Sequence, residues 1–110
     1  MPAHKALNLT PSELLERQNS GELWRILDVR EPWEYEIARV AGAVSMPMRE
    51  LPRRLAELDA ASPVAVLCHS GVRSAQVADW LADNGFATVA NVQGGIDAWS
   101  IDIDTTIPRY

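Results

Sequence analysis

The stretch Cys68-His69-Ser70-Gly71-Val72-Arg73-Ser74 decides the fold, because it joins the apolar run 64–67 to a helical pattern over about 73–84. It reads as a strand, a tight loop and the start of a helix. A loop that enters a helix N-terminus directs backbone N–H groups inward at the positive end of the helix dipole, so it favours anions, thiolates included. The single cysteine of the chain lies at the mouth of this loop.

Length and composition set the scale of the molecule. With 110 residues, of which 47% are hydrophobic, the chain can build one core but not two ordinary domains, so we expect a single domain over residues 1–110. The longest apolar stretches fall far short of the roughly 18 residues that a membrane helix needs, and residues 1–9 lack the apolar centre of a signal peptide. We therefore expect a cytoplasmic protein that does not associate with membranes.

Charge and cysteine content narrow the function classes further. The net charge is −5 and the basic residues are scattered, which argues against nucleic acid and anionic membrane surfaces as partners. One cysteine cannot form an internal disulfide, and Cys68 with His4 and His69 is too small a set for a structural zinc site. We expect no metal and no cofactor, so any anion has to be attracted locally by the loop.

Strand and helix patterns alternate along the chain. Strands are expected at 6–9, 23–27, 43–46, 64–67 and 88–92, and helices near 10–20, 32–37, 51–58, 73–84 and 94–99. The first helix has Thr10 at a plausible N-cap and Glu13 three residues later, the spacing of a capping box. The alternation predicts an α/β fold, a five-stranded parallel sheet with helices on both faces. Ligands of such sheets bind at the carboxyl ends of the strands, where Asp28, Arg30 and Cys68 all fall.

Four pieces of the sequence resemble the rhodanese family of sulfurtransferases, and their order and spacing extend over nearly the whole chain. The pieces are Asp28-Val29-Arg30-Glu31-Pro32 with Glu34, Gly42-Ala43 with Pro47, the loop Cys68 to Ser74, and Gly94-Gly95 with Ala98-Trp99. The ending Ile107-Pro108-Arg109-Tyr110 is also similar to the tail of single-domain members. The resemblance implies a rhodanese-like fold and persulfide chemistry at Cys68.

Sulfur transfer needs a thiolate that attacks the outer sulfur of a donor such as thiosulfate, holds it as a persulfide and yields it to a thiol, cyanide or protein acceptor. The N–H groups of residues 69–73, the helix dipole and Arg73 are expected to favour the thiolate and to hold the oxyanion of the donor. Cys68 is the predicted nucleophile. The predicted substrate-binding residues are His69, Ser70, Gly71, Val72 and Arg73.

Loop length separates sulfur from phosphorus chemistry. Cysteine phosphatases of a related fold place five residues between cysteine and arginine, whereas this loop has four between Cys68 and Arg73. A tighter cradle suits a persulfide better than a phosphate. A second hypothesis remains open, in which the chain is a sulfur-delivery or partner-binding module with a protein acceptor and little activity on free thiosulfate.

Several residues also have plain structural interpretations. Arg73 could take part in a surface ion pair, and the His69 side chain is expected to diverge from its neighbour Cys68. Arg30 is close enough in sequence to pair with Glu34, and we expect it and Asp28 to be structural. Gly94-Gly95 is expected to mark close backbone approach beneath the loop, and Trp33, Trp80 and Trp99 to pack in the core or at its rim. Arg39 stands where many family members have histidine, and we expect it to be merely exposed.

Overall fold

The computed structural model describes residues 6–110; part of the expected N-terminal lead-in, including His4, lies outside this range. The strands are β1 (Leu7–Leu9), β2 (Arg25–Asp28), β3 (Val44–Ser45), β4 (Val64–Leu67) and β5 (Val89–Val92). The helices are α1 (Pro11–Asn19), α2 (Pro32–Ile37), α3 (Leu51–Arg54), α4 (Val72–Asp83) and α5 (Gly95–Asp102), with short 3₁₀ turns η1 (Met48–Glu50) and η2 (Leu55–Glu57).

The strands form one five-stranded sheet in the order β1-β5-β4-β2-β3, and each neighbouring pair is parallel. Strand β4 is central, with Val66 opposite Leu27 of β2 on one side and Asn91 of β5 on the other. Cys68 immediately follows this central strand, so it lies at the carboxyl edge of the sheet. The expected α/β fold with a five-stranded parallel sheet is confirmed.

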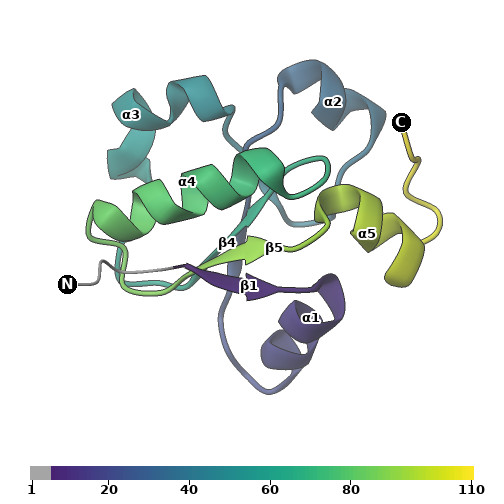
Figure 1. Cartoon of the computed structure of the whole chain (residues 1–110), viewed down its shortest axis with the longest axis horizontal. Helices are drawn as coiled ribbons and strands as arrows, with labels where there is room; N and C mark the ends of the chain where they lie inside the picture. The colour runs from purple at the N-terminus through teal and green to yellow at the C-terminus, as the bar shows by residue number, and fades with distance from the viewer. Residues whose placement is uncertain (1–5) are drawn as a thin grey trace.

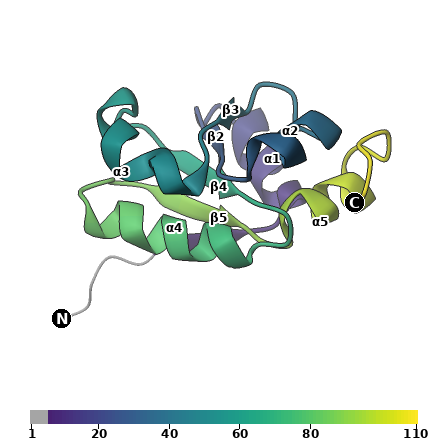
Figure 2. The same cartoon turned by 90° about the horizontal axis from the view of Figure 1, so that it is seen from above.

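Helices cover both faces of the sheet, and the side chains of β4 alternate between two cores. Val64 and Val66 belong to the core under α3 and α4, whereas Ala65 and Leu67 belong to the core under α1 and α5. All four residues of β4 are buried, as expected for a strand covered on both faces. Figures 1 and 2 show α4 along β4 and β5, with the loop before α4 next to α5 and the C-terminus at the same end.

Local capping signals predicted the start of α1 correctly. The Thr10 side chain accepts from the Glu13 N–H at 3.1 Å, and the Glu13 carboxylate accepts from the Thr10 N–H at 2.8 Å. This capping box satisfies backbone donors that the first turn of a helix leaves unpaired. Within residues 6–110, no helix is both long and apolar enough to cross a membrane.

The expected continuous helix over 51–58 is wrong. The segment divides into α3 and η2, and the backbone departs from helical geometry at Arg54, where φ is −110° and ψ is 7°. Leu51 and Leu58 still enter the same core beneath α4, while Leu55 packs against it only partly buried. The two outer leucines therefore reach the core without the continuous helix that their spacing predicts.

Candidate active site

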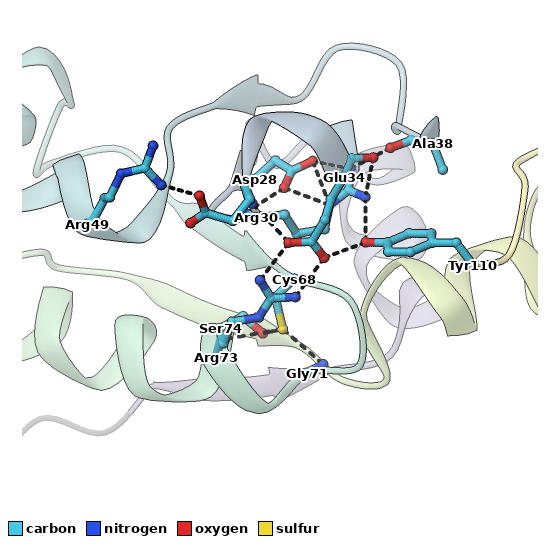
Figure 3. Close-up of polar contacts among 11 residues, drawn as sticks. Asp28, Arg30, Glu34, Ala38, Arg49, Cys68, Gly71, Arg73, Ser74 and Tyr110 are labelled. Atoms are coloured by element: carbon cyan, nitrogen blue, oxygen red, sulfur yellow. Dashed lines mark hydrogen bonds and ion pairs between the residues drawn. The ribbon is translucent and has the colours of Figure 1, made fainter. Parts of the chain in front are cut away.

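The sulfur of Cys68 lies in a cradle of donors at the start of α4. Its Sγ accepts hydrogen bonds from the backbone N–H of Gly71 at 3.1 Å and of Ser74 at 3.3 Å, and the Ser74 hydroxyl lies 3.2 Å away (Figure 3). Only 1% of Cys68 is exposed. The second backbone donor lies one residue beyond the expected range of 69–73. N–H groups at a helix N-terminus can stabilise negative charge, so these backbone donors are suitably placed for an anionic sulfur.

The Gly94-Gly95 turn and α5 hold this loop from below. The N–H of Ile96 donates to the carbonyl of Cys68 at 2.8 Å, and the N–H of Asp97 donates to the carbonyl of His69 at 3.1 Å. A Cβ on Gly95 would lie 2.5 Å from the Cys68 carbonyl oxygen. The expected close backbone approach beneath the loop is therefore confirmed, and two N–H groups in the first turn of α5, which have no partner within that helix, hold the loop that follows Cys68.

The other loop residues lie at the rim. Ser70 and Val72 are exposed, and Val72 shows 67% of its surface. Gly71 has φ of +98°, a conformation that favours glycine, and it lets the chain turn back over the sulfur. The ring of His69 stacks on that of Tyr110, with centroids 4.2 Å apart and planes inclined by 20°. His69 thus joins the loop to the C-terminal segment.

Arg73 is held by Glu34 of α2 in a bidentate ion pair with N···O distances of 2.7 and 2.9 Å (Figure 3). The Glu34 side chain is only 4% exposed, whereas that of Arg73 is 33% exposed. An arginine in the first turn of a helix opposes the dipole, and the Glu34 carboxylate offsets this by neutralising its charge. The ion-pair interpretation of Arg73 is confirmed, with a buried carboxylate rather than a surface one.

Arg30 is fully buried and forms a second network behind this pair. Its guanidinium binds the Asp28 carboxylate at 2.6–3.2 Å and donates to the carbonyls of Glu34 and Ala38 at 3.2 and 2.6 Å. The expected pairing of Arg30 with the Glu34 side chain is wrong, because Arg73 binds that carboxylate and Arg30 reaches only the backbone of Glu34. The contacts agree with a structural role for Asp28 and Arg30.

Sequence reasoning missed the part that Tyr110 plays. Its hydroxyl accepts from Arg30 at 2.9 Å and donates to the Glu34 carboxylate at 2.7 Å, so it links the two networks. Burial raises the pKa of Tyr110 to about 12. The resemblance of the segment 107–110 to family tails was the one signal of its importance. Asn91, which accepts from Ser74, was also missed, although an amide within the apolar run 89–92 is itself a signal.

The remaining expectations concern residues around this site. Trp99 is 5% exposed in the core and Trp80 packs against the other core, while Trp33 is 60% exposed and meets the Tyr110 ring edge-on at 6.1 Å. Arg39 is exposed as expected, with its guanidinium 5.1 Å from the centroid of the Tyr35 ring. The Arg39 guanidinium therefore makes a cation–π contact at the surface.

Acid should weaken this fold through Glu34, and Glu34→Gln tests it. The hydrogen bonds from Arg73 lower the pKa of Glu34 from 4.5 to about 2, assisted by the Glu31 N–H and the Tyr110 hydroxyl. Because the pKa is lower in the folded state, ionised Glu34 stabilises the fold above pH 4.5, by about 3 kcal/mol, and this is lost as the pH falls toward 2. At pH 7 the variant should be about 2–3 kcal/mol less stable than the parent. Its free energy of unfolding should also change less as the pH falls below 4.5.

Urea unfolding of the parent and of Glu34→Gln between pH 2 and pH 7 measures the difference in stability at pH 7 and the dependence of stability on pH. The matched control is Glu36→Gln, an exposed glutamate on the same helix, which should reproduce the parent curve within about 0.5 kcal/mol. Parallel curves for the parent and Glu34→Gln over the whole range would contradict the role of the Arg73 ion pair.

The fold and the site together define a parallel α/β domain with a cysteine in an anion-favouring loop at the carboxyl end of its central strand. The sequence model of the rhodanese-like domain matches residues 10–102. The chain therefore belongs to the rhodanese-like domain family.

Two relatives and one solved structure illustrate the similarity. The chain is 42% identical over 90 residues to rhodanese-like/PpiC domain-containing protein 12, chloroplastic, of Arabidopsis thaliana, covering 78% of this chain and 30% of that protein. It is 39% identical over 85 residues to the putative sulfur carrier protein YrkF of Bacillus subtilis, covering 77% and 46%. The chain thus matches less than half the length of either relative.

The solved structure is a rhodanese-like domain protein from Staphylococcus aureus. It superposes with a TM-score of 0.79 at 29% sequence identity, covering 97% of this chain and 99% of that one. The agreement in fold therefore extends over almost the entire length of both chains.

Proposed function

We propose that the chain is a rhodanese-type sulfurtransferase in which Cys68 carries the sulfur. The observation that carries the proposal is the placement of Sγ at the start of α4, where the N–H groups of Gly71 and Ser74 donate to it. These donors face a negative charge on sulfur in both the thiolate and the persulfide.

The reaction has two displacement steps. The Cys68 thiolate attacks the outer sulfur of the donor, and with thiosulfate the S–S bond breaks and sulfite leaves with the electron pair. The acceptor then attacks the outer sulfur of the Cys68 persulfide, so a thiol becomes a persulfide or cyanide becomes thiocyanate. Cleavage of the Cys68 S–S bond returns the thiolate for another turnover.

The loop residues contribute to donor and acceptor binding in different ways. The backbone of His69, Ser70, Gly71 and Val72 forms the rim through which donor and acceptor enter, and the exposed Ser70 and Val72 side chains contact them. Arg73 contributes positive charge from one side, but both terminal nitrogens of its guanidinium donate to the Glu34 carboxylate. Binding of the transferred sulfur therefore depends mainly on backbone N–H groups.

A second candidate function, delivery of sulfur to a protein acceptor with little activity on free thiosulfate, is favoured by the same ion pair. Thiosulfate is a dianion, and the carboxylate of Glu34 offsets the charge of Arg73 beside Cys68. The similarity to a protein named as a putative sulfur carrier supports this alternative. A low kcat/KM for thiosulfate, with fast transfer from the Cys68 persulfide to a protein thiol, would favour delivery over the free-donor reaction.

Intact-protein mass spectrometry tests the shared step. After exposure to thiosulfate or to a low-molecular-weight persulfide, the parent protein should gain the mass of one sulfur atom, and cyanide should remove it. Cys68→Ser, which replaces the one cysteine of the chain, should gain nothing. A parent protein that takes up no sulfur from either donor, or a Cys68→Ser variant that transfers sulfur at the parent rate, would overturn the proposal.

A further inference from the structure

A line of buried hydrogen bonds leads from the Cys68 sulfur to the surface of the first strand. The Ser74 hydroxyl lies 3.2 Å from Sγ beneath the loop (Figure 3) and donates to Oδ1 of Asn91 at 2.5 Å. Nδ2 of Asn91 donates in turn to Oδ1 of Asn8 at 3.0 Å. Ser74 and Asn91 are 0% and 6% exposed, whereas Asn8 is exposed.

Sheet register explains why these side chains meet. Asn91 of β5 lies opposite Asn8 of β1 on one side and opposite Val66 of β4 on the other, so the three side chains share the face covered by α4. Ser74 in the first turn of α4 packs onto that face. The line therefore joins the catalytic loop to the edge strand through an asparagine buried in the sheet.

The number of available protons decides which group donates and which accepts at each hydrogen bond of this line. A serine hydroxyl has one proton, and in the orientation described Ser74 gives it to Asn91. Ser74 then offers Sγ only a lone pair, so the 3.2 Å contact is satisfied when the sulfur carries a proton and donates. This direction of the Ser74 hydroxyl fits the Cys68 thiol, and it leaves a sulfur anion with only the two backbone donors.

Rotating the two amides reverses the line without displacing a heavy atom by much, since amide O and N are similar in size. Nδ2 of Asn91 then donates to Ser74, whose own proton is free to point at the sulfur. Oδ1 of Asn91 accepts from Nδ2 of Asn8, and the exposed Asn8 can turn at little cost. This second direction fits a thiolate or a persulfide, and every buried polar atom keeps a partner.

We propose that Ser74, Asn91 and Asn8 form a relay of positioning residues whose hydrogen-bond direction reverses with the charge on the Cys68 sulfur. When the thiol ionises, its proton leaves to solvent, Ser74 keeps its own proton and turns it toward sulfur, and the two amides rotate. The relay rests on the proposed role of Cys68 as the sulfur carrier. It assigns control of the reactive anion to a surface amide on β1.

Other charged groups near Cys68 form a constant background. Arg73 of α4 interacts with the sulfur through space, and Glu34 of α2 holds that arginine. Tyr110 contacts both networks and the His69 ring, and Asp97 of α5 interacts with His69. None of these groups is altered by substitutions at Asn8.

The test fixes the direction of the relay from its exposed end. An aspartate at position 8 can only accept, so Asn8→Asp obliges Asn91 to donate outward and holds Ser74 in the direction that suits the thiol. The midpoint of the pH dependence of iodoacetamide alkylation should rise by about one to two pH units, the equivalent of one lost hydrogen bond to the anion. Asn8→Ala, which imposes no direction, should shift the midpoint less.

Two controls separate the relay from the added charge of the aspartate. The shift should persist in about 0.5 M salt, which screens an exposed charge strongly. The shift should vanish in a Ser74→Ala background, which removes the hydroxyl of the relay. If Ser74→Ala folds poorly, Asn91→Leu interrupts the relay instead. The shift should return in a Ser74→Thr background, which restores a hydroxyl. An equal shift in the intact and cut backgrounds would overturn the relay.

The relay and the proposed function can fail separately. Normal sulfur uptake by mass spectrometry, with an alkylation midpoint that Asn8→Asp leaves unchanged, would overturn the relay alone. A shifted midpoint that depends on Ser74, in a protein that takes up no sulfur, would support the relay as a control of the thiol and overturn the sulfurtransferase proposal.

Discussion

Arg30→Met is expected to lower the free energy of unfolding by about 3–5 kcal/mol, the range typical of breaking one side of a buried ion pair. The guanidinium is 0% exposed and binds the Asp28 carboxylate, two backbone carbonyls and the Tyr110 hydroxyl. Methionine fills a similar length but leaves a buried carboxylate without its counter-charge. Urea unfolding monitored by circular dichroism measures the loss.

The control and the rescue follow from the same contacts. Arg39→Met removes an exposed arginine and should change stability by less than about 0.5 kcal/mol. Adding Asp28→Asn to Arg30→Met removes the unpaired charge and should recover part of the loss. If Arg30→Met were as stable as Arg39→Met, the buried network would not be holding the junction between β2 and α2.

Gly95→Ala is expected to reduce sulfur transfer by about 100-fold, as a displacement of about 1 Å at a reacting group can do. The added Cβ would lie 2.4 Å from the His69 carbonyl oxygen and 2.5 Å from that of Cys68, and both are backbone atoms. The loop has to move away from α5 and lose the hydrogen bonds of Ile96 and Asp97. Single-turnover transfer from the loaded persulfide measures the effect.

Gly85→Ala is the matched control because Gly85 also has a positive φ, outside the allowed left-handed region, but lacks the clash. Gly85 has φ of +92° and Gly95 has φ of +62°, but a Cβ at Gly85 would meet no atom within 4 Å. Gly85→Ala should cost about 1 kcal/mol in stability and leave the transfer rate near that of the parent. Equal transfer rates for the two variants would show that the contact beneath the loop does not position Cys68.

Much of the fold was predictable because its signals are local. The capping box at Thr10, the buried strand 64–67 and the glycine-containing loop after it each depend on residues a few positions apart. The helix over 51–58 was mispredicted because its leucine spacing satisfies a helix, whereas the core requires only that Leu51 and Leu58 reach it.

The partners in the site were less predictable. Glu34 was expected to pair with Arg30, four positions away in the chain, yet its carboxylate binds Arg73 across 39 positions and the Tyr110 hydroxyl across 76. Charged groups on the segments that follow adjacent strands compete for one another in space, and nearness in sequence does not decide the outcome. The link from Ser74 through Asn91 to Asn8 likewise depends on which strands are neighbours.

The sequence by itself determined the α/β class, the loop that surrounds Cys68 and the glycine turn beneath it, because helix starts, strands and positive-φ turns follow from neighbouring residues. Only the tertiary structure decided that Glu34 neutralises Arg73, that Tyr110 joins the two arginine networks and that a buried asparagine connects the sulfur to β1. The physical reason is that a buried polar group binds whichever partner the sheet order and packing bring within hydrogen-bond distance.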